Sequence, residues 1–168
     1  MAIITLKNNS LSSVTALPAG VGGKVLQVVQ SIGTGATFTT TSTSFVATGT
    51  NVSITPSSTS SKIFVMCSTG LFWVNSSASD GTGGVATIYR GASNINPNSG
   101  GGQMLRNYRI GAVNIQSGGL TMSVLDSPNT TSSTTYTVYI KSLWNNPTVQ
   151  WNSQDDDVAV ITAMEIAG

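Results

Sequence analysis

The chain has 168 residues, of which 39% are hydrophobic and 8% are charged, and its formal net charge is +1. Ordinary soluble domains have about 25% charged residues, so the polarity of this chain comes from Ser, Thr, Asn and Gly instead. The low net charge argues against a nucleic-acid partner, and no apolar run is long enough for a membrane-spanning helix. Apolar residues never keep helical spacing without interruption, which predicts an all-β domain.

Residues 1–23 are predicted to form a short, irregular N-terminal arm. Ile3, Ile4 and Leu6 fit a short strand, but a polar stretch and several glycines follow them. The opening MAIITLKNNS lacks the charged start, the long apolar centre and the cleavage site of a signal peptide, so we expect synthesis and folding in a cytoplasm. A segment with so little core of its own either frays or becomes ordered on a partner.

From Lys24 onward the pattern predicts β-strands separated by turns, so residues 24–168 are expected to form one β-sandwich domain. Eight to ten strands at this spacing indicate an antiparallel sandwich, and the long connections favour its jelly-roll form. The predicted strands cover residues 25–32, 37–46, 52–54, 62–74, 85–90, 103–115, 120–125, 134–144, 148–151 and 158–166.

The predicted strand 62–74 is apolar on both faces and follows a turn that begins at Pro56. One face has Ile63, Val65, Cys67, Leu71 and Trp73, and the other has Phe64, Met66, Phe72 and Val74. We therefore expect an inner strand with protein on both sides. In a monomer the second set would form an exposed apolar stripe, so these four residues are predicted to form an interface between identical chains.

The last predicted strand, 158–166, is apolar on both faces except for Glu165. Such a strand is expected in the middle of a sheet. Ile161 and Ile166 are both predicted to belong to its well-packed centre.

Enzymatic chemistry finds little support in the sequence. The chain has no histidine, which excludes Ser-His-Asp and Cys-His catalysis. The single cysteine, Cys67, has no histidine or clustered base to activate it, so a buried thiol is expected rather than a nucleophile. The segment Gly20–Lys24 lacks the spacing and the hydroxyl residue of a phosphate-binding loop. We expect no enzyme and no cofactor.

Two features leave room for a ligand. The cluster Asp155-Asp156-Asp157 offers carboxylates to a hard cation, but adjacent residues of an extended segment point in opposite directions, so no metal site is predicted. Trp73, Trp144 and Trp151 are candidates for stacking on sugars, although core packing is the commoner role of tryptophan. The loop 92–102 is long and glycine-rich, and loops of this kind tend to have functional or mobile roles.

Three segments carry a resemblance to a known family: NNSLSSVTALPAGVGGKVLQVVQ, VSITPSSTSSKIFVM and VAVITAMEIAG. Together they resemble small structural proteins of tailed bacteriophages, especially phages of marine bacteria. The resemblance covers the first half of the chain and its last ten residues. It implies a β-sandwich head that is trimeric, like heads of the tumour-necrosis-factor type, and that is attached to a virion. In such a homotrimer the interface residues Phe64, Met66, Phe72 and Val74 are predicted to lie near the threefold axis.

The leading hypothesis is therefore a homotrimeric virion protein that acts as a head decoration, short fibre or tail appendage. The N-terminal arm is expected to attach it to other virion proteins through a small set of apolar residues: Ile3, Ile4, Leu6, Val14 and Leu17. The alternative is a module that binds a glycan or receptor on the host surface through loops such as 92–102. An enzyme that degrades host polysaccharide is the least favoured possibility.

Overall fold

The computed structural model describes residues 24–34, 37–76, 82–96, 102–107, 114–152 and 157–168. Within these ranges the chain forms eleven β-strands and no helix, so no described helix can cross a membrane. The all-β prediction is confirmed. The five predicted anchoring residues, Ile3, Ile4, Leu6, Val14 and Leu17, lie outside the described residues.

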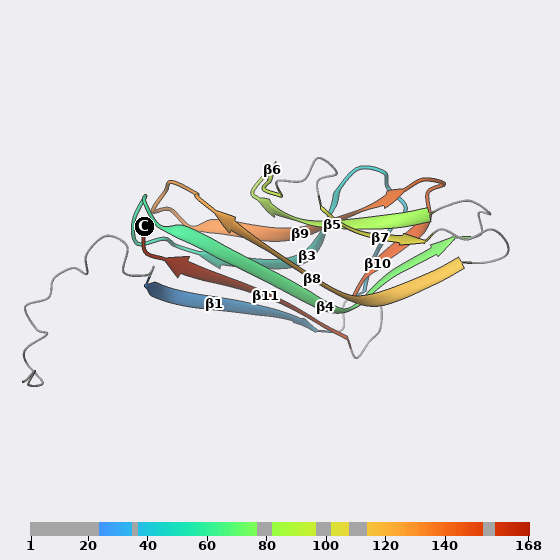
Figure 1. Ribbon diagram of the computed structural model, residues 1–168, viewed down its shortest axis with the longest axis horizontal. Coiled ribbons are helices and arrows are strands. Elements are labelled where there is room, and N and C mark those ends of the chain that lie inside the picture. The colour runs from blue at the N-terminus through green and yellow to red at the C-terminus, as the bar shows by residue number, and fades with distance from the viewer. Residues whose placement is uncertain (1–23, 35–36, 77–81, 97–101, 108–113, 153–156) are drawn as a thin grey trace, which may run out of the picture.

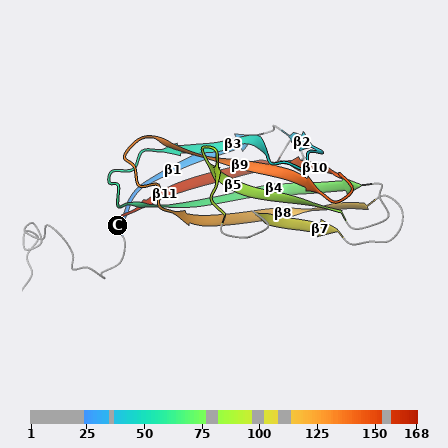
Figure 2. The ribbon, with the colours of Figure 1, turned by 90° about the horizontal axis from the view of Figure 1, so that it is seen from above.

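The strands form two antiparallel sheets that pack face to face (Figures 1 and 2). Sheet A contains β1 (Val25–Thr34), β2 (Phe38–Thr40), β4 (Lys62–Ser76), β8 (Asn114–Asp126), β10 (Thr148–Trp151) and β11 (Val158–Ile166). Sheet B contains β3 (Val46–Ile54), β5 (Thr82–Arg90), β6 (Ser93–Asn94), β7 (Gln103–Asn107) and β9 (Thr134–Leu143).

Two strands that the sequence places inside a sheet are indeed internal. β4 pairs with β11 and β10 and also with β8, and β11 lies between β1 and β4. Both strands are rich in β-branched and aromatic residues, which suit a pleated surface that is at least half buried. The long connections thus bring the last strand of the chain into the centre of sheet A.

The core lies between the sheets and is formed by alternate residues of the long strands. Ile161 is fully buried there, as predicted. Ile166 is only half-buried, because it pairs with Lys62 on the opposite face of sheet A. The core members include Val52, Ile54, Ile63, Val65, Cys67, Phe72, Val74, Ile88, Tyr136, Val138, Ile140, Val149, Trp151 and Ile161.

The single strand predicted over residues 37–46 is wrong. Residues 38–40 form β2 on sheet A, whereas the chain enters sheet B only at Val46. The hydroxyl-rich turn between them explains the break, because Ser42 N–H donates to Thr40 Oγ1 (3.0 Å) and Ser44 N–H donates to Ser42 Oγ (3.1 Å). These local side-chain bonds compete with strand pairing. Part of the predicted loop 92–102 also pairs as a strand, in β6.

Both ends of the described chain lie at one pole of the sandwich (Figure 1). The backbone N–H of Ala167 donates to the carbonyl oxygen of Lys24 at 2.9 Å. The first described residue, Lys24, therefore lies beside the C-terminal residues.

Candidate interaction surface

A β-bulge divides the residues predicted for the trimer interface. In β4, Thr69 pairs with Leu120 and Phe72 with Gly118, so β4 has one more residue than β8 between these pairs. Because side chains alternate between the two faces of a strand, one inserted residue moves every later side chain to the opposite face. Phe72 and Val74 consequently enter the core, at 0% and 1% exposure.

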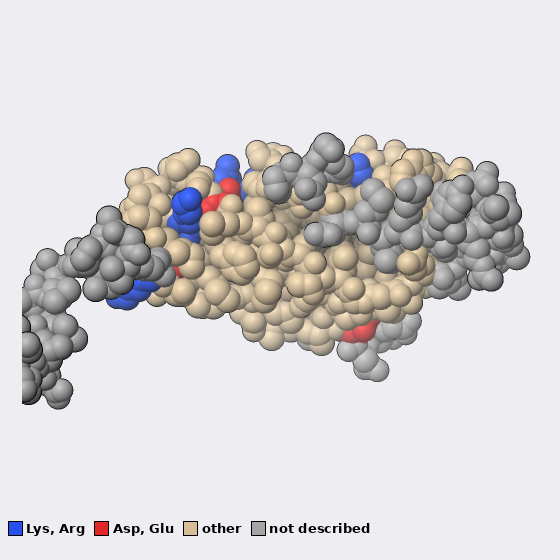
Figure 3. Space-filling model, viewed as in Figure 1, with Lys and Arg blue, Asp and Glu red and all other residues tan. Residues whose placement is uncertain are grey.

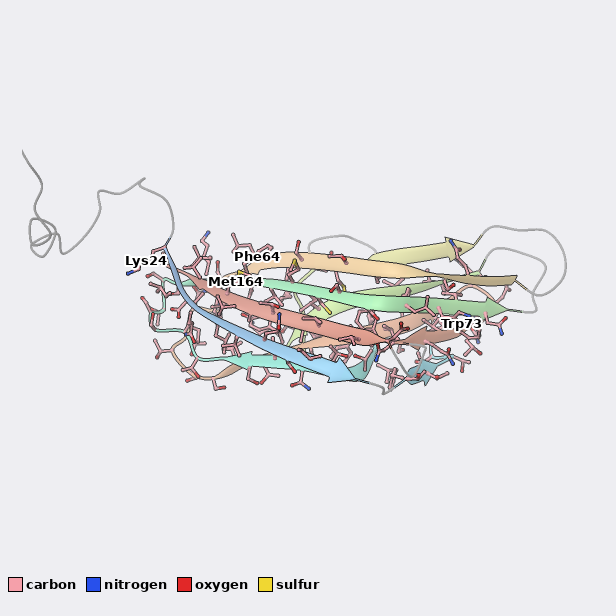
Figure 4. The ribbon with its side chains drawn as sticks, turned by 90° about the horizontal axis from the view of Figure 1, so that it is seen from below. Lys24, Phe64, Trp73 and Met164 are labelled. Carbon is pink, nitrogen blue, oxygen red and sulfur yellow. The ribbon has the colours of Figure 1, made fainter. Side chains whose placement is uncertain are left out.

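Phe64 and Met66, by contrast, lie on the outer face of sheet A, where Phe64 is half-buried and Met66 is 39% exposed. The prediction that all four residues share one face is therefore wrong. Trp73 takes the outward direction instead, and Figure 4 shows Phe64 near Met164 with Trp73 farther along the same sheet.

One row of four apolar side chains crosses the outer face of sheet A. Val28 of β1 is opposite Met164 of β11, Met164 is opposite Phe64 of β4, and Phe64 is opposite Leu125 of β8. Directly opposed residues of an antiparallel ladder have side chains on the same face. Val28 and Leu125, at the two ends of the row, are 56% and 55% exposed.

Further apolar side chains continue this face along the strands. The next row is polar except for Met66, and Gln30 donates to Thr162 in it at 3.1 Å. The row after that contains Ile32 opposite Val160, and Ile32 is 57% exposed. We call the following set the apolar face: Val28, Ile32, Phe64, Met66, Leu125, Val160 and Met164.

Charge is scarce on and around the apolar face. Lys62 is exposed at its rim, opposite Ile166. Of the three acidic residues in the described ranges, Asp126 and Glu165 bond to groups of the interior, and Asp157 lies against Gly70. Figure 3 shows that uncharged residues form most of the visible surface of the molecule. Among the described residues, the apolar face itself therefore contains no charged side chain that would repel a second copy.

Glu165 is a buried carboxylate that closes one end of the sandwich. It is 0% exposed, and it accepts hydrogen bonds from Ser57 N–H (2.7 Å), Ser57 Oγ (2.6 Å) and Gln27 Nε2 (2.6 Å). Burial alone would raise the pKa of this carboxyl, but the bonds from Ser57 and Gln27 lower the pKa to about 2. A carboxylate held so firmly in its charged form acts as a structural acceptor and is unsuited to proton transfer.

A second polar connection joins the two sheets. Arg90 Nη1 of sheet B contacts both carboxylate oxygens of Asp126 in sheet A, at 2.8 and 2.9 Å. The hydroxyl of Tyr136 donates to Asp126 Oδ2 at 2.8 Å. Burial, together with this hydrogen bond, raises the pKa of Tyr136. The three side chains tie β5, β8 and β9 together across the core.

The remaining residues considered for chemistry do not form a reactive site. Cys67 is fully buried, and burial raises the pKa of its thiol to about 12. Trp151 is also buried and donates to Thr50 Oγ1 at 3.0 Å, so it cannot stack on a sugar. Asp155 and Asp156 lie outside the described residues, and the described part of the chain contains no cluster of three potential metal ligands.

The outer face of sheet B has an aromatic cluster that was not predicted. The rings of Tyr89 and Tyr139 stack with centroids 4.0 Å apart, and Phe45 meets Tyr89 edge-on at 5.8 Å. Lys141 Nζ lies 4.5 Å from the centre of the Phe45 ring. The alternation in residues 134–143 is enough to place Tyr139 and Lys141 on one face. Phe45 and Tyr89 come from distant parts of the sequence, so no local pattern indicates that they join these two residues.

No protein-family model and no curated protein matches this sequence. We therefore infer function from the two surfaces described above, the apolar face of sheet A and the aromatic cluster of sheet B.

Proposed function

We propose that this chain is a structural protein of a bacteriophage virion and that it assembles as a homotrimer through the apolar face. The row Val28, Met164, Phe64 and Leu125 is the observation that supports assembly best. The row spans four neighbouring strands, and hence about 14 Å of sheet at the usual strand spacing. Contiguous apolar surface of this kind marks sites of protein association.

A second copy of the chain is the partner that suits this face best. The seven residues of the apolar face are uncharged and Lys62 lies at its rim, so identical faces can approach without strong like-charge repulsion. Identical chains usually assemble with closed symmetry. The revised interface replaces Phe72 and Val74 with residues of β1, β8 and β11, and it keeps Phe64 and Met66.

The strand order supports a jelly-roll form for each protomer. Strands pair from the ends of the chain inward, with β1 beside β11, β3 beside β9, β4 beside β8 and β5 beside β7. Pairing of this kind is produced when a long hairpin folds over into two Greek keys. Such a domain displays loops at both poles.

The position of the chain ends supports attachment through the arm. Lys24 and the C-terminus share one pole, so an arm of residues 1–23 attached to other virion proteins would leave the opposite pole pointing away from the particle. In this arrangement the protein would be made in the host cytoplasm and would then become part of the particle as a decoration, short fibre or tail appendage.

Assembly is tested by the mass of the full-length protein in multi-angle light scattering. We expect a trimer for the wild type and a monomer for Phe64→Asp, since the new carboxylate would be buried without a partner. Thr131→Asp adds the same charge in the exposed loop between β8 and β9 and should remain trimeric. A monomeric wild type would contradict the proposal.

Attachment is tested by deleting residues 1–20 in the phage genome that encodes the chain. The shortened protein should fold and form trimers but should be missing from purified virions, as measured by immunogold labelling and mass spectrometry. Its presence at the wild-type copy number would show that the arm is not the anchor.

A further inference from the structure

The aromatic cluster occupies the face of the molecule opposite to the apolar face. Neighbouring residues of β9 alternate, so that Tyr136, Val138 and Ile140 are buried in the core while Tyr139 and Lys141 point away from it. Tyr139 lies between Ala47 of β3 and Thr87 of β5 in the sheet register. Tyr139 and Tyr89 therefore lie on the two inner strands of sheet B, β9 and β5, and Phe45 directly precedes the edge strand β3.

Polar groups that can form hydrogen bonds surround these rings. Thr87 Oγ1 donates to Asn94 Oδ1 at 2.9 Å, which fixes the start of the segment after β5 beside Tyr89. The same Asn94 oxygen accepts from the backbone N–H of Asn96 at 3.0 Å. Residues 93–96 belong to the loop that the sequence indicates as functional, and in the sheet register Asn94 lies directly opposite Tyr89.

The hydroxyls of Tyr89 and Tyr139 provide hydrogen-bonding groups at the ends of the two stacked rings. Burial, together with the nearby Tyr139, raises the pKa of Tyr89. Each hydroxyl can both donate and accept a hydrogen bond. An aromatic ring with hydroxyl and amide groups around it combines an apolar surface with directional polar contacts.

The positive charge of Lys141 in the cluster favours a ligand with a negative charge. Lys141 is the charged residue in contact with the rings, and the three described acidic side chains, Asp126, Asp157 and Glu165, make their contacts elsewhere. Among the described residues, a cationic ligand would therefore meet the Lys141 ammonium group without a neighbouring carboxylate to balance it. A ligand with an apolar ring face, several hydroxyls and a negative charge would match every group present.

We infer that Phe45, Tyr89, Tyr139 and Lys141 form a binding site for an acidic saccharide. One pyranose ring packs against the exposed ring surface of Tyr139, its hydroxyls bond to the tyrosine hydroxyls, and its carboxylate pairs with Lys141. This site lies on the sheet opposite to the proposed trimer interface, so the two proposals can fail separately.

Cross-strand aromatic pairs also stabilise sheets without binding anything. The two roles make different predictions. If the cluster is purely structural, its mutation lowers the stability of the fold, and titration with a sugar gives no binding heat. If the cluster is a binding site, titration gives a binding heat that saturates, and the affinity depends on the charge of the sugar.

The experiment uses the full-length protein and two probes of equal length, a galacturonic acid oligomer and a neutral galactose oligomer, in isothermal titration calorimetry. We expect the wild type to bind the acidic oligomer at least tenfold more tightly than the neutral one. Lys141→Gln should remove this preference, so that the acidic oligomer binds no more tightly than the neutral one. Tyr139→Ala should weaken binding of both oligomers at least tenfold.

Trp144→Ala is the matched aromatic control, because Trp144 is 48% exposed and lies outside the cluster. It should bind both oligomers as the wild type does. If Tyr139→Ala does not fold, Tyr89→Phe and Tyr139→Phe keep the rings and remove only the hydroxyls, and each should weaken binding. Absence of binding to both oligomers, or equal losses in the cluster variants and in Trp144→Ala, would overturn the inference.

Discussion

The carboxylate of Glu165 accepts hydrogen bonds from both the backbone N–H and the hydroxyl of Ser57, at 2.7 and 2.6 Å. Ser57 belongs to the turn that separates β3 from β4, and Glu165 lies near the end of β11, which is 108 residues away. The contact joins the turn after Pro56 to the last strand of the chain. The segment VSITPSSTSSKIFVM, which contains Ser57, therefore has a clear structural role.

Replacement of Glu165 by Gln should destabilise the fold by about 1–3 kcal/mol, the usual cost of leaving a buried polar group without its partner. The pKa of the Glu165 carboxyl falls from its ordinary value of 4.5 to about 2 in the folded chain. The folded state therefore binds this proton more weakly than the unfolded state. The stabilisation is complete above about pH 4.5 and is lost as the pH falls toward 2.

Urea unfolding between pH 7 and pH 2.5 measures this effect. The wild type should lose stability with acid more steeply than Glu165→Gln. Ser57→Ala removes one of the three bonds and should give an intermediate slope. Parallel pH curves for the wild type and Glu165→Gln would show that this carboxylate does not govern acid stability.

The bulge in β4 predicts opposite consequences for two neighbouring aromatic residues. Phe72 is fully buried, so Phe72→Ala should cost about 3–5 kcal/mol through lost transfer energy and a residual cavity. Trp73 points outward and is only half-buried, so Trp73→Ala should cost clearly less. Chemical denaturation compares the two variants, and a larger loss for Trp73→Ala would mean that the strand runs without the bulge.

The contact among Arg90, Asp126 and Tyr136 should behave as one unit. Tyr136→Phe removes the buried hydroxyl and should cost about 0.5–1.5 kcal/mol, while Asp126→Ala leaves two donors unpaired and should cost about 1–3 kcal/mol. A double-mutant cycle should show coupling between the two changes, because both act on the same hydrogen bond. Additive losses would contradict this arrangement.

Cys67 should be inert in the folded protein. Its thiol is fully buried and its pKa is raised to about 12, so almost no thiolate exists at pH 8. Ellman's reagent should therefore react with Cys67 only after unfolding in guanidinium chloride. Rapid labelling of the native protein would show that the strand opens or that the thiol is exposed.

Local patterns in the sequence determine several features of this protein. Alternating apolar residues and turn signals predict an all-β sandwich, the central positions of strands 62–74 and 158–166, and a buried, unreactive Cys67. These features follow from side-chain period and composition, which depend only on near neighbours in the chain. The position of Phe64 and Met66 on an apolar surface also follows from alternation within one strand.

Features that depend on contacts between distant parts of the chain are decided only by the tertiary structure. The period of a strand is two residues, so the bulge after Thr69 moves Phe72 and Val74 to the opposite face, and nothing in the alternation marks where that bulge occurs. The partners of Glu165 are separated from it by more than 100 residues. The aromatic cluster likewise unites side chains of β5 and β9 with Phe45. Pairing between distant strands creates these sites, and no local sequence pattern specifies which strands become neighbours.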